Sequence, residues 1–318
     1  MSLPSANSPI ASAASYVPVV PTTNQPQTNW TYEEAFSRNI GLISEEDQQR
    51  LRNCRVAIPG MGGVGGVHLI TLARLGVGAF NIADADEFSV ANFNRQYGAN
   101  TASVGASKTE TMASAAKSIN PEIKLRVTNE FVTPENVDAF LTDVDVLVDS
   151  VDFFSIDARR LIFREAAKRG IWAITAGPIG FSTAWLVFDP NGMSFDQYFD
   201  LHDEMSKEEK LIAFAVGLTP KATQRSYIDL SKVDLNSGAA PSVGLACQLA
   251  SGAAAAEVVK VLTGAGKLRP APYYQQFDVR KMKFVQGRLL RGNRGPLQQL
   301  KRRILKSICN KNVSNFSN

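Results

Sequence analysis

Four glycines in this chain have the spacing that cradles a phosphate group. Gly60, Gly62, Gly63 and Gly65 give the pattern Gly-x-Gly-x-x-Gly between an apolar run at 55–60 and a segment of helical periodicity. Such glycines permit a tight turn and a close backbone approach to an anion, and the free N–H groups of the following helix bind it. The pattern predicts nucleotide binding; a tight strand-to-helix turn without a ligand is the alternative.

One acid and two cations follow the glycines at informative distances. Asp84 ends the next apolar run roughly 20 residues after Gly65, the spacing at which an acid hydrogen-bonds a ribose. Arg95 and Lys108 are expected to return toward the glycine side of the sheet, where they would suit a triphosphate better than a dinucleotide. Lys108 opens a predicted helix, a position that disfavours a cation unless an anion lies nearby. Taken singly, each of these charges could equally be a solvated surface group.

A second acidic segment, Asp149-Ser-Val-Asp152, follows a later apolar run. Mg²⁺ binds through one or two carboxylates together with substrate phosphates, so Asp152 could hold it. In the alternative interpretation Asp149 caps a turn and Asp152 is only solvated.

The elements that must position these residues alternate along the chain. A capping box at 44–47 starts a short helix. Apolar runs are expected to form strands at 55–60, 79–83, 144–148, 171–175 and 184–188, with helices at 67–75, 107–119 and 157–168 between them. This order predicts a Rossmann-like, doubly wound, mostly parallel α/β sheet with helices on both faces and a C-terminal strand and helix extension. Ligands of such sheets bind at the carboxyl ends of the strands.

Composition excludes several other chemistries. The chain has 318 residues, of which 44% are hydrophobic, with only three cysteines and two histidines. The cysteines are widely spaced and lack a CxxC pair, which argues against a disulfide framework or a cysteine zinc site. The scarcity of histidine argues against a Ser-His-Asp or multi-histidine metal mechanism. No targeting signal is apparent, so a cytoplasmic location is expected.

Three parts of the chain differ in character. Residues 1–29 are rich in Ser, Pro, Ala, Asn and Thr and are expected to be a disordered leader, followed by one domain at 30–290. Within that domain, residues 243–262 read as a buried helix rather than a membrane span.

The third part, residues 291–318, belongs to a basic stretch, since residues 280–311 hold eleven Lys and Arg and no acid. A predicted amphipathic helix there places Leu297, Leu300, Ile304 and Ile308 on one face. That helix could meet an acidic partner or surface, or pack its apolar side on the body of the protein.

Together, several motifs resemble the ThiF/MoeB family, the adenylating half of the ubiquitin-activating enzymes. The resemblance runs from Phe36 to Phe284, and its pieces are Ser37-Arg38-Asn-Ile, RVAIPGMGGVG, ARLGVGAFNIADADEFSVANFNRQ, VGASKTE, Ile119-Asn120-Pro121 and DVLVDSVD. It implies an enzyme that binds MgATP and activates the C-terminal carboxylate of a ubiquitin-like or sulfur-carrier protein, or of a peptide, as an acyl-adenylate.

The resemblance also implies a set of site residues. Asp84 would take the ribose and Asp152 would hold Mg²⁺, while Arg38 would reach across the interface of a homodimer. The remaining contacts to ATP would come from the glycine loop and from Asp86, Asn92, Arg95, Gln96 and Lys108. Arg38 could instead be an ordinary charge beside a helix.

Departures from the family pattern limit the expected chemistry. The paired CxxC motifs of many relatives are absent, so no zinc is expected, and Phe153 stands where many relatives have Asn. No cysteine lies between 189 and 237, while Cys54 and Cys247 read as packing residues, which favours adenylation without a thioester step. Two alternatives stay open: a non-catalytic relative that binds nucleotide and partner, and an NAD- or FAD-dependent oxidoreductase.

Overall fold

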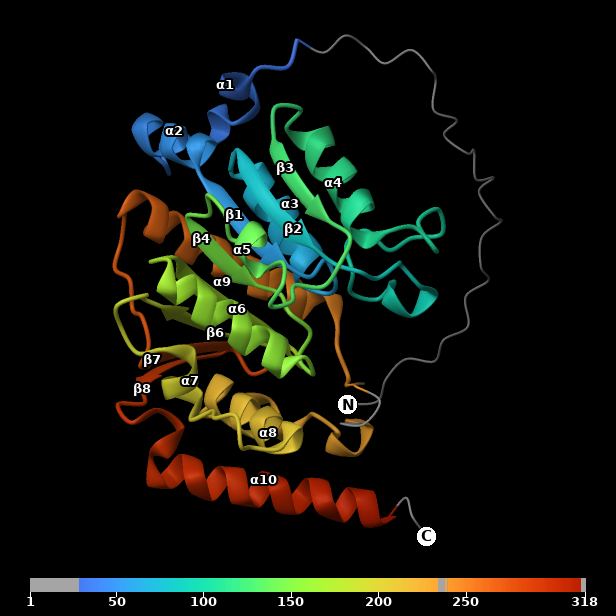
Figure 1. The fold of residues 1–318 in the computed structure, drawn as a ribbon, viewed down its shortest axis with the longest axis vertical. Coiled ribbons are helices and arrows are strands. Elements are labelled where there is room, and N and C mark those ends of the chain that lie inside the picture. Colours follow the sequence, from blue (N-terminus) through green and yellow to red (C-terminus); the bar gives the residue numbers. More distant parts are fainter. Residues whose placement is uncertain (1–28, 234–237, 239, 316–318) are drawn as a thin grey trace, which may run out of the picture.

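The computed structural model describes residues 29–233, 238 and 240–315. The leader expected at 1–29 falls, except for Asn29, outside these residues. The remaining chain forms one eight-stranded sheet with helices on both faces (Figure 1).

The sheet combines a parallel half with an antiparallel extension. Its strands run in the order β3-β2-β1-β4-β5-β6-β7-β8, parallel from β3 to β5 and antiparallel from β5 to β8. A two-residue connection with Gly180 at φ +61° reverses the chain between β5 and β6. The strands are β1 (Arg55–Pro59), β2 (Ala79–Ala83), β3 (Lys124–Thr128), β4 (Val146–Asp149), β5 (Trp172–Ile179), β6 (Ser182–Phe188), β7 (Tyr273–Asp278) and β8 (Lys283–Arg288).

Alternation along the buried strands divides the core into two layers. In β1, Val56 and Ile58 face the layer beneath α2, α3, α4 and α9, while Ala57 faces the layer beneath α5 to α8. The longer helices are α2 (Glu45–Asn53), α3 (Gly65–Arg74), α4 (Lys108–Ile119), α6 (Ile156–Lys168), α8 (Lys207–Leu218), α9 (Gly244–Thr263) and α10 (Pro296–Asn315). The short ones are α1 (Tyr32–Ala35), α5 (Val137–Phe140) and α7 (Phe195–Phe199).

The expected fold class is confirmed, and the predicted elements that carry the motifs occur within a few residues of their expected bounds. Ser44 caps α2 by accepting from the Asp47 N–H at 3.1 Å. The strand β3 was missed because it lies at the sheet edge, where its residues stay half or fully exposed and leave no apolar run.

Helix α9 is long and apolar enough to cross a bilayer by length and composition alone. It packs on the sheet, however, and Ala250, Ala254 and Val258 are buried in the same layer as Val56 and Ile58. This agrees with the prediction of a buried helix.

The C-terminal helix α10 forms as expected. One alternative predicted that its apolar side packs on the body of the protein, but polar side chains make the buried contacts instead. Gln298 is buried and donates to the Val216 carbonyl at 3.1 Å, and Lys301 donates to the Pro220 carbonyl at 2.7 Å. Carbonyls at and just beyond the end of α8 lack helical partners. The polar side chains of α10 satisfy them. Of the predicted apolar face, Leu297, Leu300 and Ile304 are exposed, whereas Ile308 is half-buried.

Candidate functional site

The loop between β1 and α3 carries two glycines that the fold itself requires. Gly60 has φ +104°, and a Cβ there would lie 2.6 Å from the Ser150 carbonyl oxygen. A Cβ on Gly65 would lie 1.8 Å from the Gly60 carbonyl oxygen. These contacts leave no room for a side chain, so internal packing explains both glycines.

Gly62 and Gly63 have no such requirement. A Cβ on Gly62 would come no closer than 3.6 Å to Gln96 Nε2, and one on Gly63 would lie 3.5 Å from Cys247 Sγ and 3.9 Å from the Arg95 side chain. These are ordinary van der Waals distances, and neither residue has a positive φ. The space over this turn, at the start of α3, therefore fits a group from outside the chain, as a phosphate cradle requires.

Asp84 holds this loop in place from the end of β2. Its buried carboxylate accepts from the Met61 N–H at 2.6 Å and from the Asp86 N–H at 2.9 Å. Sequence reasoning assigned Asp84 to a ribose, and its position beside the loop is compatible with that prediction. The structure adds a second task, since the same carboxylate fixes the turn that would bind the phosphates.

Arg95 and Gln96 lie against the glycine turn, where the prediction placed them. The half-buried Arg95 guanidinium donates to the Ala91 carbonyl at 2.9 Å and to Asn94 Oδ1 at 3.0 Å. Within the described part of the chain it contacts no carboxylate, so its charge remains available to an anion. Gln96 is buried, and its Oε1 accepts no hydrogen bond from the residues that the structure describes.

Asn94 and Asn92 support this segment rather than face the glycines. The Asn94 carbonyl accepts from the Gly244 N–H at 3.1 Å and thereby ties the segment to the start of α9. Asn92 Oδ1 accepts from the Ser89 N–H at 2.9 Å and closes a capping box. In the predicted phosphate contact, Asn92 would therefore donate from its side-chain amide nitrogen.

Lys108 is buried at the start of α4 and already has a partner. Its ammonium contacts Asp86 Oδ2 at 2.8 Å, and the Asp86 side chain is about half exposed. Asp86 is bonded in turn to Asp84, and Met112 of α4 contacts the position of Gly66, so Lys108 belongs to the same neighbourhood as the loop. A nucleotide would have to share the ammonium with Asp86.

The two acids after β4 have different environments. Asp149 is buried; it accepts from Arg159 Nε at 2.8 Å, from Thr175 Oγ1 at 2.7 Å and from the Val151 N–H at 3.1 Å. Asp152 is exposed, and one of its oxygens accepts from the Phe154 N–H. Only Asp152 can meet a metal ion without breaking the core.

The donor set around Asp152 suits Mg²⁺ only together with phosphate oxygens. Among the residues whose placement is described, no group of three His, Cys, Asp or Glu side chains could hold a metal ion. Mg²⁺ usually keeps several waters and takes one or two carboxylates plus phosphate, which one exposed carboxylate near a phosphate cradle can satisfy.

Two supporting residues escaped the sequence analysis. Ser150 Oγ lies within hydrogen-bond distance of the Pro59 carbonyl (2.7 Å) and the Gly60 carbonyl (2.9 Å), and so joins the acidic loop after β4 to the glycine loop. Arg159 stacks on the Phe214 ring and donates to the Val151 and Asp152 carbonyls. The arginines of α6 gave no signal, because solvent-facing and inward-facing arginines look alike in a sequence.

Arg38 is not part of the site within one chain. It is exposed in a short 3-10 helix (Ser37–Asn39), and the neighbouring Asn39 donates to the Leu75 carbonyl just beyond the C-terminal end of α3. The glycine loop is at the other end of this ten-residue helix, about 15 Å away along its axis. Arg38 could reach a site only in another copy of the protein.

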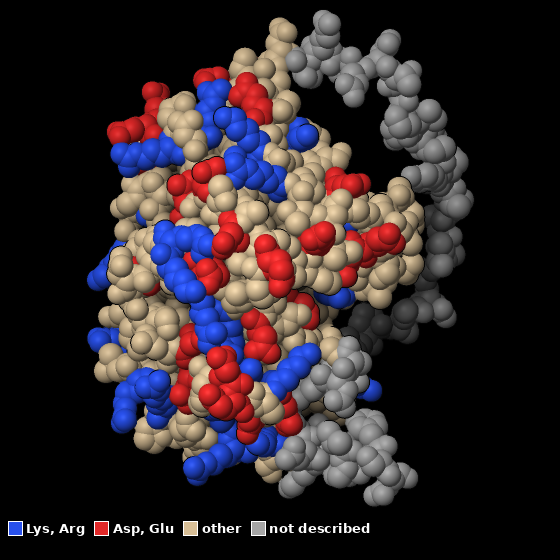
Figure 2. Space-filling view, viewed as in Figure 1, with Lys and Arg blue, Asp and Glu red and all other residues tan. Residues whose placement is uncertain are grey.

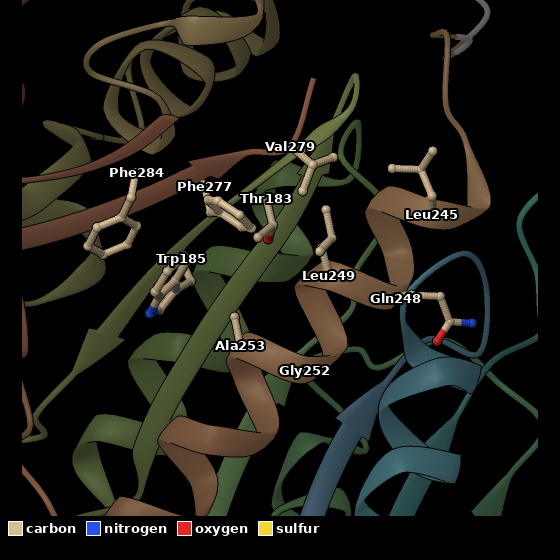
Figure 3. Close-up of a pocket in the computed structure, with 10 residues that line it drawn as sticks. All are labelled: Thr183, Trp185, Leu245, Gln248, Leu249, Gly252, Ala253, Phe277, Val279 and Phe284. Atoms are coloured by element: carbon tan, nitrogen blue, oxygen red, sulfur yellow. The ribbon is translucent and has the colours of Figure 1, made fainter. Parts of the chain in front are cut away.

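An apolar groove runs along α9. It has a volume of about 930 Å³, and no charged residue lines it. Figure 3 shows Leu245, Leu249 and Ala253 of α9 on one side and the rings of Trp185, Phe277 and Phe284 on the other.

The thiols with described side chains are buried and unreactive in character. Burial raises the pKa of Cys54 to about 12 and that of Cys247 to about 11. Both agree with the prediction that these cysteines are packing residues. The side chain of Cys309 lies outside the described part of the structure.

The sequence and fold were then compared with known proteins. Residues 36–295 match the ThiF family. A tRNA threonylcarbamoyladenosine dehydratase of Haemophilus influenzae is 32% identical over 153 residues, 48% of this chain and 58% of that protein. A probable adenylyltransferase/sulfurtransferase MoeZ of Mycobacterium tuberculosis is 26% identical over 256 residues, 78% of this chain and 58% of that protein. The chain thus matches little more than half the length of these relatives.

A crystal structure of MccB from E. coli with MccA-N7isoASN shares the fold. It aligns with a TM-score of 0.62 at 18% identity and covers 85% of this chain and 75% of that one. At this identity the likeness concerns the fold alone.

Proposed function

Because the chain belongs to the ThiF family, we propose that it is an ATP-dependent adenylyltransferase that activates a carboxylate and releases pyrophosphate. The observation that carries this proposal is the open turn at Gly62 and Gly63, faced by an arginine with no described carboxylate partner. The fold needs no glycine at either position, whereas a bound phosphate does.

In the proposed reaction an oxygen of the substrate carboxylate attacks the α-phosphorus of ATP. The bond from that phosphorus to the bridging oxygen breaks, and pyrophosphate leaves with the electron pair. The loop N–H groups, Arg95 and Lys108 would stabilise charge on the phosphates, and no residue needs to act as a histidine base. Mg²⁺, held by Asp152, would offset part of the triphosphate charge.

The remaining contacts would surround the nucleoside and the phosphates. We assign the ribose contacts to Asp84 and the neighbouring Asp86. We assign further phosphate contacts to Gln96 and to the side-chain amide nitrogen of Asn92. The bonds from Asp84 to the loop and from Arg159 to the Asp152 carbonyl would hold these groups in place before ATP binds.

The substrate we propose is the C-terminal carboxylate of a ubiquitin-like or sulfur-carrier protein, or of a peptide. The name of the MoeZ relative, which aligns with 78% of this chain, supports an adenylated substrate. A second candidate is a carboxylate on a modified tRNA nucleoside, favoured by the name of the relative with 32% identity. Both candidates share the first half-reaction, so one assay with different substrates separates them.

We further propose a homodimer in which Arg38 of one copy serves the site of the other. The position of Arg38 at the far end of α3 supports this, because the residue has no path to its own glycine loop. The uncharged groove along α9 would be the contact face, since it leaves the large apolar side chains of Leu245 and Phe284 exposed.

ATP–pyrophosphate exchange tests the activity. Carrier proteins, peptides and tRNA would each be supplied with labelled pyrophosphate, and one of them should support exchange. Arg95→Ala and Asp152→Ala should each abolish it without unfolding the protein, whereas the exposed-site controls Arg291→Ala and Glu130→Ala should not. Normal exchange in Arg95→Ala or Asp152→Ala would refute the assigned role.

Complementation tests the dimer. Arg38→Ala and Lys108→Ala would each be inactive alone, but a mixture contains dimers with one intact composite site and should recover part of the activity. Sedimentation should show a dimer that Leu245→Asp disrupts. A monomer in solution, or a mixture with no recovery, would overturn the trans role of Arg38.

A further inference from the structure

Helix α10 exposes a ridge of apolar side chains at the edge of the molecule. Leu297, Leu300 and Ile304 are 71%, 53% and 43% exposed, and their spacing puts them on one side of the helix. Figure 1 shows α10 as the outermost of the described elements at this end of the molecule. This ridge is defined here as the α10 ridge.

The α10 ridge cannot turn inward, because a neighbouring face of the helix is fixed by buried hydrogen bonds. Asn293, just before α10, is fully buried and donates to the Phe199 and Ala213 carbonyls at 3.0 and 2.7 Å. Gln298 and Lys301 donate to carbonyls at and beyond the end of α8. Rotating α10 would leave these buried groups unpaired, each at a cost of about 1–3 kcal/mol.

The charged side chains beside the ridge are positive, and not all of them form ion pairs. Arg302 and Lys306 pair with Asp200 and Glu209 of the body. Arg303, next to Ile304, is exposed and contacts no carboxylate among the residues described. Residues 296–315 contain no Asp or Glu, so nothing in the helix offsets it.

We propose that the α10 ridge binds an acidic amphipathic helix of a partner protein. A second helix can set its own apolar residues between Leu297, Leu300 and Ile304, because ridges of this spacing pack helix on helix. Acidic residues flanking that helix would meet Arg303. The site is separate from the adenylation centre and needs no ATP.

Charge argues against the other occupants. A second copy of α10 would bring another basic helix without a single acid against Arg303. An anionic membrane would meet Glu204, which is exposed just before α8; Figure 2 shows acidic side chains directly above the basic ones at this lower edge. Nucleic acid would leave the apolar ridge uncovered.

The test uses a synthetic three-heptad peptide with leucine at the core positions and glutamate at the flanks, labelled for fluorescence anisotropy. The full-length protein should bind it, and Leu300→Asp should weaken binding at least tenfold. Met282→Asp, at an exposed apolar residue in the β7–β8 turn, is the matched control and should bind normally. Circular dichroism would confirm that both variants are folded.

Arg303→Glu should weaken binding of the glutamate peptide and improve that of a peptide with lysine flanks. The proposal is overturned if the wild-type protein binds neither peptide, binds both equally, or is unaffected by Leu300→Asp. It is also overturned if Leu300→Asp instead abolishes self-association or binding to phosphatidylserine vesicles.

Discussion

Gly63→Ala should weaken ATP binding and Gly65→Ala should lower stability, although both glycines belong to one motif. A Cβ at Gly65 would lie 1.8 Å from the Gly60 carbonyl oxygen, well inside van der Waals contact. The loop or the first turn of α3 must move by more than an ångström to admit it. We expect Gly65→Ala to lower the free energy of unfolding by about 3 kcal/mol, the upper part of the range for overpacking.

Gly63→Ala should leave stability nearly unchanged. The added methyl group would meet only Cys247 and Arg95 at 3.5 and 3.9 Å, and the backbone needs no positive φ. It would, however, fill the space where a phosphate oxygen approaches the loop amides. Loss of one or two charge-assisted hydrogen bonds costs about 3 kcal/mol, equivalent to about a 150-fold rise in the Kd for ATP.

Urea unfolding and titration calorimetry with MgATP measure the two effects separately. Gly295→Ala is the matched control, because its φ is −61° and a Cβ there would come no closer than 3.5 Å to the Gly292 carbonyl oxygen. It should change neither the affinity for ATP nor the free energy of unfolding. Wild-type ATP affinity in a folded Gly63→Ala protein would refute the phosphate cradle. Wild-type stability of Gly65→Ala would refute the packing explanation of that glycine.

Three further predictions concern other parts of the fold. Burial without a described hydrogen-bond partner lowers the pKa of His68 to about 3. The contribution of neutral His68 to the free energy of unfolding is therefore complete above pH 6.5 and is lost as the pH falls toward 3. In urea unfolding, the wild type should lose about 2 kcal/mol more of this free energy than His68→Leu between pH 7 and pH 5. Equal losses in the two proteins would contradict the prediction. Asn293→Leu leaves two buried carbonyls unpaired and should lower the unfolding free energy by about 3 kcal/mol, with an unchanged urea midpoint as the contrary result. Cys54 and Cys247 should resist iodoacetamide at pH 8 and react after denaturation, because burial raises both pKa values; mass spectrometry would reveal any modification in the native state.

Local sequence patterns predicted much of the candidate site. The glycine spacing, the acid at the end of β2 and the capping serine before α2 act over a few residues, so their roles can be recognised from the order of residues in the sequence. The same holds for the strand and helix order of the parallel half, where buried apolar runs alternate with helical periodicity. The structure places the Arg95 side chain beside Gly63, while its contact with a phosphate stays a prediction.

Choices between similar residues depended on contacts made far along the chain. The sequence offered Asp149 and Asp152 as near neighbours, and only the packing of α6 on β5 gave Asp149 to Arg159 and left Asp152 in solvent. Lys108 read as a free cation, but the fold pairs it with Asp86.

By itself, the sequence determined the family of the fold, the position of the phosphate loop and the amphipathic character of the last helix. Only the tertiary structure decided which face of α10 turns inward. Apolar burial favoured one orientation, but the unpaired carbonyls at the end of α8 required donors, and the buried polar contacts prevailed.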